Sequence, residues 1–210
     1  MQDHVIATDA DIARGLDWLV RAEPRFGEAL AITGPPPLRR RAEGFGPLLR
    51  IVISQQVSVA AAEGIWKRVQ AAGADSERGL SGLSDADLRA CGLSAAKVRY
   101  ARAIAEAALD YPALRARPEP EAMAELMAIP GIGRWTAEIY LLFCVGRADV
   151  FAPGDLALQE ASRMLFSLPD RPNARALDRM AAAWSPWRAV AARQLWAYYA
   201  VVKRREGVPT

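Results

Sequence analysis

Apolar residues recur at helical spacing along almost the whole chain, and this pattern is the feature that most constrains the fold. Ile12, Leu16, Leu19 and Val20, for example, follow the three- and four-residue steps of one helix face. No segment shows the alternation of apolar and polar residues that is typical of a half-buried strand. The β-branched run Ile51-Val-Ile53 lies within a helical pattern. The sequence therefore predicts an all-α protein.

Glycine, proline and capping residues divide this pattern into separate helices. Thr8 and Asp11 have the spacing of a capping box at the first helix, and Gly34-Pro-Pro-Pro37 breaks the chain after it. Ser84 and Ser94 have the positions of N-caps. Beyond the first helix, the pattern predicts helices over about residues 47–54, 58–72, 84–92, 94–111, 121–128, 133–145, 156–166, 174–183 and 186–204.

Size and charge allow several classes of protein. The 210 residues are 52% hydrophobic, so they can form a sizeable core in one large domain or two small ones. A formal net charge of +3 is compatible with nucleic acid but equally with many other substrates. The N-terminus does not resemble a signal peptide, and no apolar run reaches about 18 residues. We therefore expect a cytoplasmic protein without a membrane span.

Cysteine and histidine are scarce, which excludes several kinds of site. Cys91 and Cys144 lie far apart, with neither a disulfide framework nor zinc-ligand spacing. Because an iron–sulfur cluster needs four thiolates, none is expected, and both cysteines are interpreted as buried thiols. The single histidine, His4, lies near the N-terminus, so no histidine-based metal or triad chemistry is expected.

The segment Ile129-Pro-Gly-Ile-Gly-Arg-Trp-Thr-Ala137 is typical of a hairpin between two helices. Pro130 ends the first helix, while Gly131 and Gly133 permit positive φ and place no side chain between backbone and ligand. The second helix begins near Gly133 and points unpaired N–H groups outward, where a DNA phosphate can bind. The expected phosphate-binding residues are Gly131, Gly133, Arg134 and Thr136. A plain helical connection with glycine caps is the alternative.

The carbonyl groups of the hairpin face another way and could hold a monovalent cation, Na⁺ or K⁺, that bridges to the phosphate. The candidate ligands are the backbone oxygens of Met127, Ile129 and Ile132. No cofactor is expected to be required.

Further motifs occur in one order along the chain. They are Ser54-Gln-Gln-Val-Ser-Val59, Leu93-Ser-Ala-Ala-Lys97, the hairpin, Asp149-Val-Phe-Ala-Pro-Gly-Asp-Leu156, Trp184-Ser-Pro-Trp-Arg188 and Leu195-Trp196. Over about residues 38–200 the chain resembles the helix-hairpin-helix DNA glycosylase superfamily, and its bacterial 3-methyladenine DNA glycosylase II branch most. Longer members carry an extra N-terminal β-rich domain, which we do not expect in a chain of this length.

The resemblance implies that Asp155 is the catalytic residue. Breaking an N-glycosidic bond leaves positive charge on the sugar, which a fixed carboxylate stabilises while it orients or deprotonates the attacking water. One carboxylate is sufficient when the leaving base is already cationic, as an N3- or N7-alkylated purine is. Taken alone, an Asp after Pro-Gly is more simply the cap of the helix over residues 156–166, and the two roles can coexist.

The resemblance also implies how a flipped base is held. Trp135 and Trp196 match positions of the base pocket, where aromatic rings stack on a cationic base, and Gln55 is a further candidate for the pocket. Gln56 matches the wedge that fills the space left in the duplex. A core role for the tryptophans and an ordinary loop role for the glutamines remain as alternatives, with Gln55 either supporting the loop or approaching the pocket.

Departures from the family pattern are also informative. Relatives that cleave the DNA backbone carry a Schiff-base lysine at the position of Trp135, so we expect a hydrolase without lyase activity. Ile139 and Leu156 stand where related enzymes carry pocket tyrosines, which leaves the substrate range open. Arg39-Arg-Arg41 either contacts phosphates or is a solvated charge run, and Arg188 is a candidate for an ion pair between lobes.

The resemblance implies two helical lobes with a cleft between them. One comprises residues 41–146 and ends with the hairpin; the other combines residues 1–40 with 147–210 and carries Asp155. The expected function is a monomeric, nucleoid-associated DNA glycosylase that flips out and hydrolyses alkylated purines, such as 3-methyladenine, from double-stranded DNA in base excision repair. Two alternatives are a non-catalytic DNA-binding module with the same hairpin and a glycosylase for mismatched uracil or thymine.

Overall fold

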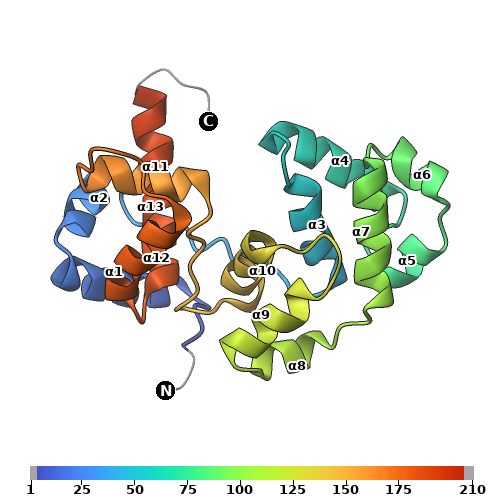
Figure 1. The fold of residues 1–210 in the computed structure, drawn as a ribbon, viewed down its shortest axis with the longest axis horizontal. Helices are drawn as coiled ribbons and strands as arrows, with labels where there is room; N and C mark the ends of the chain where they lie inside the picture. Colours follow the sequence, from blue (N-terminus) through green and yellow to red (C-terminus); the bar gives the residue numbers. More distant parts are fainter. Residues whose placement is uncertain (1–3, 206–210) are drawn as a thin grey trace. The chain divides into compact units, whose positions relative to one another are not determined.

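A computed structural model describes residues 4–205 of the chain. Among these residues there are helices and connecting segments but no strand, which confirms the all-α prediction (Figure 1). Val5 and Arg147 form an isolated antiparallel bridge. The chain divides into two compact units, Met1–Arg40 with Leu141–Thr210, here called the terminal unit, and Arg41–Tyr140, here called the middle unit. No helix in the described part of the chain is long and apolar enough to cross a membrane.

The terminal unit is organised around α13 (Arg188–Arg205), its longest helix. This helix packs against α11, α2 and α1, which surround it in Figure 1. Its inward positions, including Ala189, Val190 and Leu195, are buried. The other elements of this unit are α1 (Asp9–Ala22), α2 (Arg25–Thr33), the π-helical turn η1 (Leu141–Val145), α11 (Leu156–Leu165), α12 (Ala174–Ala181) and the 3₁₀ turn η2 (Ala182–Trp184).

The middle unit is organised around α3 and α7, which pack against each other. Helix α3 also contacts α4 and α10, while α7 contacts α5 and α6. The buried face of α3 is apolar, with Leu48, Leu49 and Val52 fully covered. The elements of this unit are α3 (Phe45–Ser54), α4 (Val59–Ala71), α5 (Glu77–Ser81), α6 (Asp85–Ala90), α7 (Ala95–Glu106), α8 (Tyr111–Ala116), α9 (Glu119–Met127) and α10 (Arg134–Tyr140).

Short polar side chains begin several helices where the sequence predicted them. Ser84 caps α6 and forms a capping box with Asp87, and Ser94 caps α7 by accepting a hydrogen bond from the Lys97 amide. At α1, the Asp11 carboxylate accepts from the Thr8 backbone amide at 2.8 Å. These bonds satisfy N–H groups that lack partners within the helix.

One predicted helix extended too far, and other helices were not predicted. The helix expected over residues 94–111 ends at Glu106, and α8 begins after Asp110, whose carboxylate accepts a hydrogen bond from the Ala113 amide. Ala108 lies between them with a φ of +45°, which no helix tolerates. Helix α2 was missed altogether, although Pro24 precedes it and Gly34, with a φ of +68°, ends it. Helix α5 was also missed, although Ser76 caps it.

Candidate active site and hairpin

Asp155 is the N-cap of α11, and its side chain is held on two sides. Its Oδ1 atom accepts hydrogen bonds from the amides of Ala157 at 3.0 Å and Leu158 at 3.1 Å. The same oxygen accepts a hydrogen bond from Trp196 Nε1 of α13 at 3.1 Å. The half-buried carboxylate is therefore oriented by the start of one helix and the indole of another. The capping role expected of an Asp after Pro-Gly is present.

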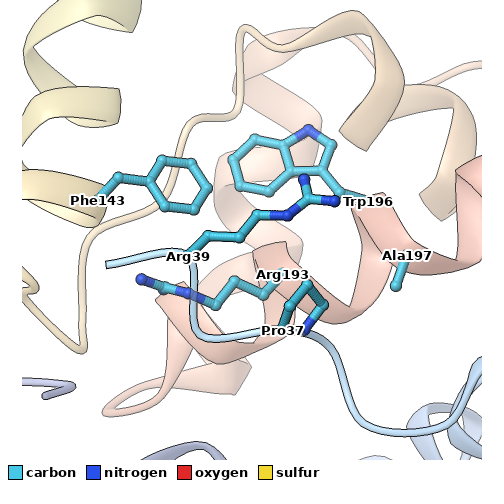
Figure 2. A pocket seen from close by; sticks show the side chains of 6 residues that line it. All are labelled: Pro37, Arg39, Phe143, Arg193, Trp196 and Ala197. Carbon is cyan, nitrogen blue, oxygen red and sulfur yellow. The ribbon is translucent and has the colours of Figure 1, made fainter. Parts of the chain in front are cut away.

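Trp196 also forms one wall of a pocket in the terminal unit. Its ring stacks on Phe143, with centroids 5.5 Å apart and an interplanar angle of 28°. Figure 2 shows the Arg39 side chain extending toward the indole. The remaining lining residues are Pro37, Arg193 and Ala197. The pocket thus combines aromatic rings with cationic groups, and one of its walls, Trp196, also donates a hydrogen bond to the Asp155 carboxylate.

Arg193 lines this pocket with a buried cationic side chain, and the residue is only 3% exposed. Its guanidinium donates to the backbone oxygens of Leu38, Leu142 and Ala189 at 3.0–3.2 Å. Its Cζ atom lies 5.0 Å from the ring centroid of Phe143, within range of a cation–π interaction. Burial, with a smaller contribution from Arg40, lowers the pKa of Arg193 to about 10. Arg193 therefore remains charged at neutral pH and fixes the ring on which Trp196 stacks.

The hairpin of the middle unit joins α9 to α10. Gly131 has a φ of +91°, and a Cβ at this position would lie 2.2 Å from Tyr100 Cγ, so both backbone conformation and packing require glycine. Gly133 differs, because its φ is not positive and a Cβ there would meet no atom within 4 Å. The freedom to adopt a positive φ is therefore used at Gly131 but not at Gly133. Gly133 is exposed at the start of α10, as the phosphate-binding prediction requires.

The other residues predicted to bind phosphate have different environments. Arg134 is exposed, and its Nε donates to the buried carboxylate of Glu138 at 2.7 Å. The side chain of Thr136 is buried, and its hydroxyl accepts a hydrogen bond from Gln55 Nε2 at 2.8 Å. Thr136 can therefore offer a phosphate its backbone N–H more readily than its hydroxyl. Trp135 is half-buried on the first turn of α10.

The loop after α3 contains the two glutamines. Gln55 Nε2 also donates to the backbone oxygen of Gly131 at 3.1 Å, so its amide ties the loop to the hairpin. Gln56 is exposed and has a φ of +57°, which is unusual for a residue with a side chain. This places the predicted wedge residue at the exposed end of a loop fixed by its neighbour.

The predicted cation ligands lie on the same hairpin. The backbone oxygen of Ile129 accepts a hydrogen bond from the Ile132 amide at 3.0 Å, which leaves the second lone pair of that carbonyl for a cation. The carbonyls of Met127 and Ile132 belong to the end of α9 and to the turn. A carbonyl donor set of this kind fits Na⁺ or K⁺, and the site stays a prediction. In the described part of the chain, no group of three His, Cys, Asp or Glu side chains is close enough to hold a metal ion.

Arg188 forms an ion pair within the terminal unit, whereas a pair between the two lobes was predicted. Its guanidinium donates to Asp149 at 2.9 and 3.2 Å, and both residues belong to the terminal unit. Ser185 Oγ donates to the same carboxylate. The pair therefore stabilises the start of α13, and the prediction of a pair between lobes was wrong.

Three residues of the pocket beside Asp155 and of the hairpin with its glutamine loop were not predicted from the sequence. Phe143 and Arg193 stand within apolar helical patterns, where nothing in the spacing indicates which residue stacks on Trp196. Lys97 was noted only as part of a family motif, but its Nζ donates to the backbone oxygens of Ile53 at 2.6 Å and Gln55 at 2.9 Å. The motif was a signal that the residue matters, without indicating its contacts.

The family model described as the HhH-GPD superfamily base excision DNA repair protein matches residues 49–188. This match covers the hairpin and Asp155, so the chain belongs to that superfamily of base excision DNA repair proteins.

Individual relatives are similar over most of their length. The chain is 27% identical to the alkylbase DNA glycosidase-like protein mag2 of Schizosaccharomyces pombe, over 91% of this chain and 95% of the relative. It is 32% identical to DNA-3-methyladenine glycosylase 1 of the same organism, over 73% of this chain and 72% of the relative.

Solved structures show the same fold. The S. pombe 3-methyladenine DNA glycosylase Mag1, in complex with abasic DNA, matches with a TM-score of 0.79 and 27% identity, over 87% of this chain and 95% of that one. A DNA-3-methyladenine glycosidase from Bacillus halodurans matches with a TM-score of 0.79 and 29% identity, over 92% of each chain.

Proposed function

We propose that this chain is a DNA glycosylase that hydrolyses alkylated purines, such as 3-methyladenine, from duplex DNA. The observation that carries the proposal is the hydrogen bond between Trp196 and Asp155. It joins an aromatic surface suited to a base with a carboxylate suited to the sugar of the same nucleotide. Membership of a base excision repair superfamily and relatives named as 3-methyladenine glycosylases support the same activity.

The chemistry requires little beyond this carboxylate. As the bond between C1′ and the base nitrogen breaks, its electron pair leaves with the base and positive charge develops on the sugar. Asp155 stabilises this charge, and a water attacks C1′ and loses a proton, for which Asp155 is the acceptor. An N3- or N7-alkylated purine leaves as a neutral molecule, so no acid is needed to protonate it.

The DNA partner follows from the middle unit and from one relative. Gly133 and the first turn of α10 offer backbone N–H groups to a phosphate, and Gln56 supplies an exposed side chain to fill the gap left by a flipped base. The Mag1 structure holds abasic DNA, the product of base removal. A cation at the hairpin carbonyls, a monomeric state and a place of action at the nucleoid belong to the same proposal.

Lyase activity is not part of this function. Trp135 occupies the position at which lyase relatives, by the resemblance, carry a lysine, and an indole cannot form a Schiff base. We therefore propose that the enzyme leaves an intact abasic strand.

A panel of duplexes, each with one lesion, tests the proposal. The purified chain is incubated with DNA containing 3-methyladenine, 7-methylguanine, hypoxanthine, or uracil or thymine in a mismatch, and free base is measured by mass spectrometry. We expect release of at least one alkylated purine, no strand cleavage, and no adduct that borohydride can trap.

Other outcomes identify the alternatives. Salt-dependent binding to duplex without release of any base would indicate a non-catalytic DNA-binding module. Release of mismatched uracil or thymine alone would indicate a pyrimidine glycosylase. Strand cleavage with a trapped adduct would contradict the absence of lyase activity.

A further inference from the structure

Lys97, on α7, lies at the C-terminal end of α3. Its ammonium donates to the backbone oxygens of Ile53 at 2.6 Å and Gln55 at 2.9 Å. The last carbonyl groups of a helix lack partners within the helix and carry partial negative charge, so a cation there is stabilising. Lys97 is half-buried, and burial lowers its pKa, which indicates that this contact is partly shielded from water. The lysine therefore fixes the point at which the chain leaves α3 for the glutamine loop.

The same helix also contacts the hairpin. Tyr100 follows Lys97 by three residues, so the two side chains lie on one face of α7. The Tyr100 ring packs so closely against Gly131 that a Cβ there would lie 2.2 Å from Cγ. One face of α7 thus contacts the glutamine loop and the hairpin turn.

Gln55 connects these two segments directly. Its backbone oxygen binds Lys97, while its side-chain amide donates to the Gly131 oxygen and to the Thr136 hydroxyl. Gln56 follows with a φ of +57°, a conformation that persists in a residue with a side chain only where the surroundings hold it. The bonds of Lys97 and of the Gln55 side chain fix the residue that immediately precedes Gln56.

We propose that Lys97 is a positioning residue that holds the loop after α3 in register with the hairpin, so that Gln56 is presented as the wedge while the hairpin binds the phosphate. The inference rests on the proposed function, because a wedge has a purpose only where a base is flipped. Lys97 touches neither base nor sugar in this account and acts through Gln56.

A double-mutant cycle between Lys97 and Gln56 tests this dependence. Lys97→Met keeps an unbranched side chain that is one atom shorter and removes the ammonium, and Gln56→Ala removes the wedge. Lys67→Met, on the exposed face of α4, is the matched control. Single-turnover experiments on alkylated duplex measure the rate constant of base release. The dependence of this rate constant on enzyme concentration separates binding from chemistry.

We expect each single variant to release base more slowly, on the order of tenfold, because inserting a side chain offsets part of the cost of unstacking. The double variant is expected to be no slower than Gln56→Ala alone, since Lys97 has nothing left to position. Lys67→Met should match the wild type. Rate losses that multiply in the double variant, or a Lys97→Met chain as fast as the wild type, would overturn the inference while leaving the proposed function intact.

A second variant and a second signal keep the test decisive. If thermal melting shows that Lys97→Met does not fold, Lys97→Gln, which keeps a polar donor, replaces it in the same cycle. Fluorescence of 2-aminopurine beside the lesion reports flipping without base release. If the wild type releases no base at all, the proposed function fails. Independently of that result, an equal flipping signal in the wild type and the Lys97 variant would overturn the inference.

Discussion

Asp155 receives its hydrogen bonds from neighbours of two kinds. Those from Ala157 and Leu158 belong to the first turn of α11 and are local in sequence, whereas the bond from Trp196 comes from another helix. The local bonds set the side-chain rotamer, and the distant one ties it to the pocket wall. A carboxylate oriented in this way before DNA binds needs little reorganisation when charge develops on the sugar.

The hydrogen bond from Trp196 Nε1 to Asp155 predicts the effect of removing this one donor. Trp196→Phe keeps an aromatic ring beside Phe143 but removes the Nε1–H donor to Asp155. We expect the rate of base release to fall on the order of tenfold, the equivalent of one hydrogen bond to a charged group. Single-turnover kinetics on alkylated duplex measure it.

Trp18→Phe on α1 is the matched control, because Trp18 is also half-buried but belongs to neither candidate region. It should release base as fast as the wild type. If both variants behave alike, the Trp196 bond contributes nothing specific to catalysis.

How far the sequence predicts the candidate site depends on the range of each contact. Pro-Gly-Asp155 before an amphipathic helix predicted the cap, because capping is local. The partnership with Trp196, 41 positions away, and that of Lys97 with Ile53 are tertiary contacts that no spacing encodes. Gly133 shows the converse, since a glycine that looked conformationally necessary occupies open space.

At the scale of elements, α1 depends on one carboxylate at its N-terminus. Asp11 Oδ2 accepts hydrogen bonds from the amides of Ala7 and Thr8 and from the Thr8 hydroxyl, at 2.8–2.9 Å. Burial raises the pKa of Asp11, but these hydrogen bonds and the nearby Arg14 outweigh it and hold the pKa below its usual value. The charged form is therefore favoured in the folded state.

This arrangement predicts a stability loss that depends on pH. Asp11→Ala is expected to lower the free energy of unfolding by about 1–2 kcal/mol at neutral pH. Because the folded pKa is depressed, the contribution is complete above the unfolded value of about 3.9 and is lost as pH falls through the folded value. Urea unfolding at neutral pH and near pH 3 should show the difference from the wild type shrinking in acid.

Asp9→Ala is the control on the same helix, because Asp9 is exposed in the first turn. Its effect should stay within about 0.5 kcal/mol. An Asp11→Ala difference that is the same at both pH values would contradict the assignment.

The helices themselves were largely predictable because caps and apolar spacing are local signals. Helix α2 was missed because Gly34-Pro-Pro-Pro37 indicates a break in the chain equally well whether or not a helix ends there. The split between α7 and α8 was also readable, since Asp110 followed by Pro112 is a helix start. The π-helical turn η1 was not, because all its residues are apolar and buried and fit an α-helix equally well.

At the scale of the whole molecule, the terminal unit is closed by contacts between its two sequence segments, near His4 and near Gly146. The Ile6 amide donates to the Gly146 oxygen, and the Ala148 amide donates to the His4 oxygen. Arg193 binds backbone oxygens on either side of the middle unit in sequence, at Leu38 and Leu142. The catalytic candidate Asp155 therefore depends on a unit whose two sequence segments fold together, whereas the hairpin and the Gln56 loop belong to the other unit.

The most direct test of the account compares Asp155→Asn with the wild type on one duplex containing 3-methyladenine. Asparagine is as good an N-cap as aspartate, so α11 should keep its start while the charge is lost. We expect base release to slow by about 100-fold or more, with the affinity for abasic duplex unchanged. Release of 3-methyladenine by Asp155→Asn at the wild-type rate would contradict the assignment of this carboxylate to catalysis.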